Sequence, residues 1–148
     1  MQPAFESSTP PVQEVVYYPG TDKLEVGYVL CYDVSATVGN PGAARTYFGA
    51  QVAKPATANL SFPAGVVMAA RQGPCEVPIA PFAKNKGRVM NVYHKVNATA
   101  FTTLLAPQDA SYGLGSHSDS GVNLPFVGVA LETANTSVTA ADKYMVIR

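Results

Sequence analysis

Residues 23–34 read KLEVGYVLCYDV, and apolar side chains occupy every even position of this stretch. A period of two is typical of a β-strand, because successive side chains on a strand point to opposite faces of the sheet. The pattern predicts a half-buried strand over residues 23–34 whose even positions lie in the core. These positions are Leu24, Val26, Tyr28, Leu30, Tyr32 and Val34.

Short strands separated by turn-forming residues are predicted along the rest of the chain. Residues 15–18 (VVYY) precede a PGTD turn, and the further candidates are residues 45–53, 64–70, 75–80, 88–96, 126–131 and 143–147. Pro63 delays the start of one strand, and Pro78 predicts an edge position for another. Residues 97–107 fit either a strand or helical turns, and residues 108–125 are expected to form a long polar loop.

The predicted fold class is all-β, because no amphipathic helix is evident. We expect a small β-barrel or β-sandwich of about eight short strands, with an extended N-terminal arm. The chain of 148 residues is long enough for one hydrophobic core. The expected division is an arm over residues 1–14 and a single β domain over residues 15–148.

The charge content argues against several classes of partner. Ten basic residues balance ten acidic ones, so neither nucleic acid nor an anionic membrane is expected as a partner. No apolar run approaches the roughly 18 residues of a membrane helix, and the first residues lack the features of a secretory signal. Cys31 and Cys75 are expected to be thiols in a reducing compartment, although the sequence leaves a disulfide between them open.

The candidate catalytic residues do not form a convincing set. His94 is expected to be structural and His117 exposed. Ser116, His117 and Asp119 are the residue types of a hydrolytic triad, but neighbours on one loop do not converge as catalysis requires. No metal-ligand spacing and no phosphate-binding glycine loop occurs. We therefore predict no cofactor, no metal and no enzymatic activity.

The N-terminal arm is rich in proline and lacks any hydrophobic period. Phe5 and Val12 are its strong apolar residues. Two interpretations stay open: a disordered tail, or an arm that docks on a neighbouring subunit and becomes ordered there.

Three segments together resemble the capsid decoration (cement) proteins of tailed bacteriophages, which are small β-rich virion proteins. They are residues 18–33 (YPGTDKLEVGYVLCYD), 54–67 (KPATANLSFPAGVV) and 126–133 (FVGVALET). The resemblance implies a structural role on the virion capsid, with the major capsid protein and copies of the same chain, as a homotrimer, for partners. It also implies synthesis in the host cytoplasm. With the arm and aromatic anchors as contacts, the expected partner-binding residues are Phe5, Pro10, Pro11, Val12, Tyr17, Tyr18 and Tyr47.

Other functions are considered beside this one. A β-sandwich module for carbohydrate would use Tyr112 in the long loop as a stacking platform, although the chain has no tryptophan. Another virion component, such as a tail or fibre-base subunit, also fits. A small hydrolase is disfavoured because no convergent catalytic set is found.

Overall fold

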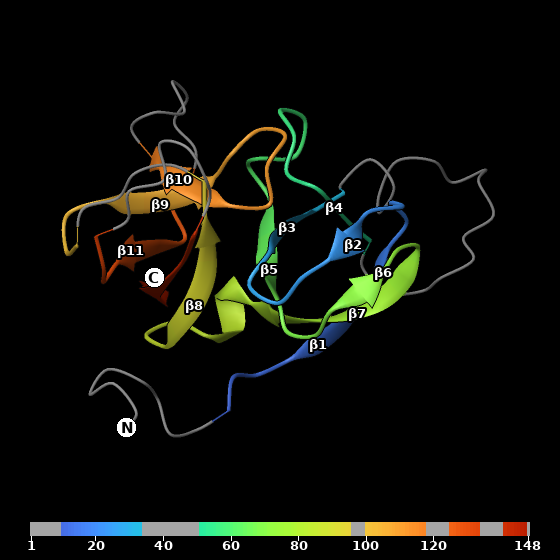
Figure 1. Ribbon diagram of the computed structural model, residues 1–148, viewed down its shortest axis with the longest axis horizontal. Coiled ribbons are helices and arrows are strands. Elements are labelled where there is room, and N and C mark those ends of the chain that lie inside the picture. The colour runs from blue at the N-terminus through green and yellow to red at the C-terminus, as the bar shows by residue number, and fades with distance from the viewer. Residues whose placement is uncertain (1–9, 34–50, 96–99, 118–124, 134–140, 148) are drawn as a thin grey trace.

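The structure is a computed structural model that describes residues 10–33, 51–95, 100–117, 125–133 and 141–147. Over these residues the chain forms twelve strands and one 3-10 helix (Figure 1). The predicted all-β, barrel-like fold class is thereby confirmed. There are more strands than the sequence suggested, partly because three have only two residues each: β2 (Lys23–Leu24), β4 (Val52–Ala53) and β6 (Arg71–Gln72).

One sheet has five antiparallel strands and curls towards closure. Its order is β1 (Glu14–Tyr18), β7 (Cys75–Pro81), β5 (Pro63–Val67), β3 (Val29–Tyr32) and β4. Tyr17 of β1 forms a parallel bridge with Gln51, just before β4, so the two edges of the sheet approach each other. This sheet is a half-barrel, and β2 and β6 form a small ladder of their own beside it (Figure 1).

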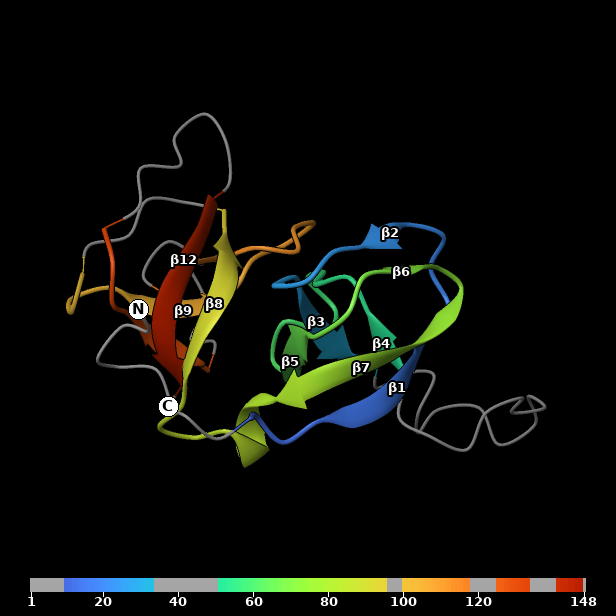
Figure 2. The ribbon, with the colours of Figure 1, turned by 60° about the horizontal axis from the view of Figure 1, so that its bottom comes forward.

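The second sheet closes into a barrel of five strands. Its order is β10 (Leu114–Ser116), β8 (Val89–His94), β12 (Ala141–Ile147), β11 (Gly128–Ala130) and β9 (Leu104–Pro107), which pairs back to β10. The contact between β8 and β10 is parallel and consists of one residue pair. The 3-10 helix η1 (Phe82–Lys84) leads from the half-barrel into the barrel (Figure 2).

Two hydrophobic cores meet at β3. Val29 packs in a core that the half-barrel shares with the barrel, where Val92 of β8 is also buried. The next residue, Leu30, packs in the core enclosed by the half-barrel, together with Ile79 of β7. Because neighbouring side chains on a strand point to opposite faces, β3 is buried on both faces. It is thus a central element of the molecule.

The single strand predicted over residues 23–34 is wrong in its continuity. β2 ends at Leu24, and a turn at Val26 and Gly27 precedes β3. Gly27 has φ 93°, a left-handed conformation that favours glycine. Val26 is 55% exposed instead of buried, whereas Val29, at an odd position, is fully buried. The alternation therefore identified β structure and placed Leu24 and Leu30 in the core correctly. It was wrong at Val26 and did not indicate that the opposite face of β3 is buried too, and Val34 lies outside the described residues.

The edge position predicted for β7 is also wrong, since β7 lies between β1 and β5. In a strand, the N–H and C=O of one residue point to the same side. The Pro78 carbonyl accepts a hydrogen bond from the backbone N–H of Met68, which follows the last residue of β5. The proline nitrogen therefore faces a point where the ladder with β5 has ended, and pairing with β1 continues through Pro78 opposite Val15.

The remaining strand predictions have different outcomes. β8 shows the predicted alternation, with Met90, Val92 and His94 buried. The ambiguous residues 97–107 contain a strand, β9. β10 lies within residues 108–125, so the prediction of one continuous loop there is wrong. Of the strand predicted at residues 45–53, all but the end lies outside the described residues.

Candidate functional site

The base of the N-terminal arm is held by a buried side-chain amide. Val12 donates its backbone N–H to Asn85 Oδ1 (2.9 Å), and its carbonyl accepts from Asn85 Nδ2 (3.0 Å). Asn85 is 1% exposed and also donates to the Pro81 carbonyl at 2.8 Å. An amide with a donor and an acceptor side by side can pair with a backbone residue much as a neighbouring strand does. This contact fixes where the residues before β1 join the body, beside η1 (Figure 2).

An ion pair follows directly along the chain. The Nζ of Lys84, the last residue of η1, pairs with the carboxylate of Glu14, the first residue of β1. The hydrogen bond with Glu14 raises the pKa of Lys84. Both side chains are substantially exposed, so the pair contributes little to folding stability. It adds a second link between η1 and the start of β1.

Only some of the residues predicted to bind a partner lie within the described part of the chain. Phe5 and Tyr47 lie outside the described residues. Pro10 is exposed, Pro11 is half-buried, and the side chain of Val12 is 43% exposed. The structure therefore presents the described end of the arm to solvent while its backbone is anchored at Val12.

The two tyrosines of β1 have different environments. Tyr17 is half-buried, whereas Tyr18 is 3% exposed and packs in the core of the half-barrel. Tyr18 shares the inward face of β1 with Val16, because alternate residues of a strand point the same way. Burial raises the pKa of the Tyr18 hydroxyl. The expectation that Tyr18 is a surface anchor is therefore corrected: its ring is a core side chain.

Tyr112 forms part of an aromatic stack and not an open platform. Its ring stacks on Tyr28, with 4.8 Å between centroids and 10° between planes, and the Lys54 ammonium lies 4.9 Å from its centroid. Its hydroxyl donates to Asp22 Oδ2 at 2.7 Å and lies 2.6 Å from the Tyr18 hydroxyl, which is then the donor of that bond. Burial, followed by these two hydrogen bonds, raises the pKa of Tyr112. The ring faces that a sugar would need are occupied, which argues against the carbohydrate-binding alternative.

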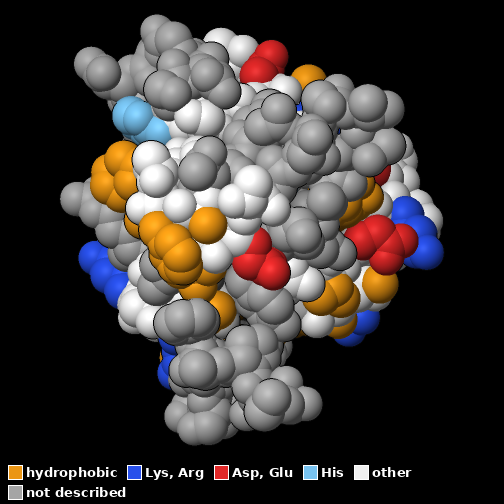
Figure 3. Space-filling view, turned by 60° about the vertical axis from the view of Figure 1, so that its left-hand side comes forward, with side chains coloured by type: hydrophobic (Ala, Val, Ile, Leu, Met, Phe, Trp, Pro, Cys, Tyr) orange, Lys and Arg blue, Asp and Glu red, His pale blue; other side chains and the backbone are white. Residues whose placement is uncertain are grey.

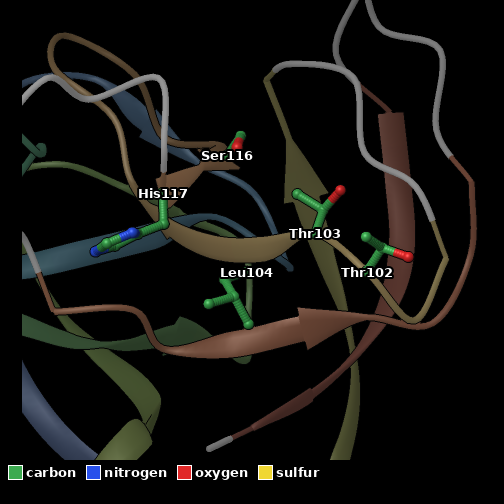
Figure 4. Close-up of a pocket in the computed structure, with 5 residues that line it drawn as sticks. All are labelled: Thr102, Thr103, Leu104, Ser116 and His117. Carbon is green, nitrogen blue, oxygen red and sulfur yellow. The ribbon is translucent and has the colours of Figure 1, made fainter.

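A pocket of about 330 Å³ lies at the barrel, between β9 and β10 (Figure 4). It is lined by Thr102, Thr103, Leu104, Ser116 and His117. The half-buried His117 ring packs edge-on against Phe126, with 5.8 Å between centroids. In Figure 4 the imidazole points away from the threonine and serine hydroxyls. On this side of the molecule, hydrophobic side chains lie next to a histidine (Figure 3).

The other residues considered for chemistry are His94 and the two cysteines. His94 is fully buried in the barrel, with Nδ1 2.9 Å from the Val92 carbonyl oxygen. Cys31 and Cys75 are both free thiols. Within the described residues, no three His, Cys, Asp or Glu side chains are grouped to hold a metal ion. The same residues contain no helix with the length and apolar character needed to cross a membrane.

Comparison with known proteins adds no relative. No protein-family model matches the chain, and no curated protein sequence matches it. The functional argument therefore depends on the residues themselves.

Sequence reasoning identified Val12 but missed the residues that hold it. Asn85 and Lys84 lie between the strands predicted at residues 75–80 and 88–96, where the sequence indicates no role for them. The contact between Val12 and Asn85 joins positions 73 residues apart, so no local pattern could have indicated it. The one local signal was the gathering of cations in the segment KNKGR, residues 84–88.

Proposed function

We propose that this chain is a non-enzymatic structural protein of a tailed-phage virion, which decorates the capsid and stabilises it by bridging major capsid protein subunits. The observation that carries the proposal is the anchored base of the arm. Asn85 holds the backbone of Val12, while the side chains of Val12 and Val15 are 43% and 55% exposed. Apolar residues fixed at the body of a protein and open to solvent are suited to contact with a neighbouring subunit.

The composition and the fold are consistent with a role that depends on contact area. Charged residues make up 14% of the chain, well below the roughly 25% of average soluble proteins. Stable interfaces between proteins bury about 1,200–2,000 Å² in total and are depleted of charge at their centre. The half-barrel and barrel supply a folded body, and in the proposed role the residues before β1 add to the area over which that body makes contact. The resemblance of three segments to cement proteins supports the same function.

The proposed assembly is a homotrimer on the outer surface of the capsid. Capsids have threefold and quasi-threefold positions, and a trimer at such a position would direct three equivalent arms to three neighbouring capsid subunits. The proposed location is the capsid surface of the virion, after synthesis in the host cytoplasm.

The experiment is to remove residues 1–11, which leaves Val12 and its contact with Asn85 in place. We expect the truncated protein to bind expanded capsids at least about tenfold more weakly than the full chain, because the arm no longer adds contact area. Purified capsids are incubated with a concentration series of each protein and sedimented. The bound protein is then quantified on denaturing gels.

The control is the stability of the truncated protein, which should unfold at the same urea concentration as the full chain. Equal occupancy by the two proteins would exclude a binding role for the arm. Failure of the full chain to bind any capsid preparation would overturn the proposed function itself.

A further inference from the structure

Tyrosine rings meet where the barrel faces the half-barrel. Tyr112 lies on the connection between β9 and β10, and its ring stacks on that of Tyr28, the residue before β3. Tyr28 also contacts Tyr93 of β8, with 5.1 Å between ring centroids and 51° between planes. The hydroxyl of Tyr112 lies 2.6 Å from that of Tyr18. We call Tyr18, Tyr28, Tyr93 and Tyr112 the tyrosine cluster.

Hydrogen bonds to the backbone hold the Tyr112 ring against the half-barrel. The connection between β9 and β10 extends from the barrel towards β3 (Figures 1 and 2). The Val29 N–H donates to the Tyr112 carbonyl at 2.8 Å, and Asp109 Oδ1 accepts from the Thr57 N–H at 2.7 Å. Because the connection is fixed at these two points, the stack of Tyr112 on Tyr28 does not depend on the ring contact alone.

The geometry of the cluster favours one pair of rings for covalent coupling. Two tyrosines couple through the ring carbons next to the carbon that carries the hydroxyl, so the two rings must overlap closely. Tyr28 and Tyr112 are nearly parallel, with 10° between planes and 4.8 Å between centroids. The tilt of 51° between Tyr28 and Tyr93 reduces the overlap of that pair. Tyr28 and Tyr112 are both half-buried, so a small oxidant can approach them.

The Tyr112 hydroxyl already has a proton acceptor. It donates to Asp22 Oδ2 at 2.7 Å, and Asp22 is exposed and can pass a proton on to water. Burial, followed by the hydrogen bonds with Tyr18 and Asp22, raises the pKa of Tyr112, so its side chain is a neutral phenol at physiological pH. The Lys54 ammonium, 4.9 Å from the ring centroid, disfavours a positive charge on the ring. An electron therefore leaves this ring most easily when the proton moves to Asp22 at the same time.

We propose that Tyr28 and Tyr112 form a site of oxidative modification, at which a one-electron oxidant joins the two rings into an intramolecular dityrosine and Asp22 accepts the Tyr112 proton. Each phenol loses one electron to the oxidant and one proton, from Tyr112 to Asp22 and from Tyr28 to water. The two phenoxyl radicals form one carbon–carbon bond, and the hydrogen on each bonded carbon then moves through solvent to the phenol oxygen. Two oxidant molecules are reduced, and the protein loses two hydrogen atoms in all.

The cross-link would fasten the barrel to the half-barrel. It joins the residue before β3 to the connection between β9 and β10, and it constrains the unfolded chain as a disulfide over a long loop does. Its chemistry needs no capsid, so its test is independent of the proposed function.

The test is oxidation of the folded full chain, at low protein concentration, by a photogenerated ruthenium(III) tris-bipyridine complex with persulfate as the terminal electron acceptor. We expect a monomer with the fluorescence of dityrosine and a mass lower by two hydrogen atoms. Peptide mapping by mass spectrometry should place the link between Tyr28 and Tyr112. The cross-linked monomer should unfold at a higher urea concentration than the untreated chain.

Conservative variants separate the roles of the residues. Tyr28→Phe and Tyr112→Phe each remove one phenol and keep the ring, so neither should form the link. Tyr28→Phe leaves the hydroxyl contacts of Tyr112 in place, so it tests the site even if Tyr112→Phe does not fold. Tyr32→Phe removes a half-buried phenol on β3 outside the tyrosine cluster and should form the link as the unchanged chain does. Asp22→Asn keeps an oxygen that can accept the hydrogen bond but is a much weaker base, so it should form the link at least about tenfold more slowly.

Three results would overturn the proposal. A link between Tyr28 and Tyr93, or dimers joined between chains in place of a cross-linked monomer, would exclude the proposed pair. An equal yield of the link in protein unfolded in guanidinium would show that the stack does not direct the coupling. An equal rate in Asp22→Asn would exclude Asp22 as the proton acceptor.

Discussion

Cys31 lies on β3 next to the register shift between Leu30 and Cys31, with none of its surface exposed. Burial raises the pKa of its thiol from 9.0 to about 12. Cys75, on β7, is half-buried, and the rise in its pKa caused by burial is partly offset by Arg71. Because the thiolate is the reactive form, the two residues should differ in reactivity. We expect iodoacetamide at pH 8 to alkylate Cys75 and to leave Cys31 unmodified in the folded protein.

The measurement is peptide mass mapping after timed alkylation, with the protein unfolded in guanidinium as the control in which both thiols react. The rate at Cys75 should rise as the pH increases from 7 to 9. Cys31 should stay unmodified over that range, because its thiol keeps its proton and is shielded from reagent. Alkylation of both residues at similar rates in the folded protein would contradict the buried position of β3.

At the scale of elements, β3 is the strand whose two faces both carry core side chains. Leu30→Ala should lower the free energy of unfolding by about 2–5 kcal/mol, since it leaves a cavity in the core of the half-barrel. Val26→Ala changes an exposed turn residue and should cost less than about 0.5 kcal/mol. Urea unfolding of both variants measures the difference. Similar losses would support one continuous strand over residues 23–34 with both residues in its core.

The sequence predicts an element well where one face of a strand is buried and the other is exposed. β8 meets this condition, so the alternation of Met90, Val92 and His94 located it. β3 does not, because both faces are buried and the turn at Gly27 interrupts the pattern. The edge position predicted for Pro78 was wrong because β5 ends opposite it, so no ladder hydrogen bond from the proline nitrogen is needed there. Where a neighbouring strand ends is a tertiary feature that the sequence pattern does not show.

The same limit applies to the candidate site. Val12 could be selected from the sequence because it is an apolar residue in a polar, proline-rich arm. Tyr18 was selected wrongly, since a period of two does not say which of the two faces is the inner one. Asn85 could not be found at all, because its role is defined by a contact across 73 residues.

At the scale of the whole molecule, the half-barrel and the barrel are joined by packing. Their shared core contains Val29 of β3 together with Val92 of β8. Outside that core, Tyr28 packs against Tyr93 of β8 with 5.1 Å between ring centroids. The Tyr93 N–H also donates to the Gly27 carbonyl at 3.0 Å. A substitution that destabilises the barrel side of this boundary should therefore also destabilise the half-barrel.

We accordingly expect the two sheets to unfold in one cooperative transition, as single domains of this size usually do. Val92→Ala should lower the free energy of unfolding by about 2 kcal/mol. If the sheets unfold together, amide hydrogen exchange by global opening should accelerate about 30-fold in β3 and β5 of the half-barrel as well as in β8. Residue-resolved hydrogen exchange measures this acceleration, under conditions in which the exchange rate reports the free energy of opening. Acceleration confined to the barrel strands would show two units that unfold separately, and the shared core would then not couple them.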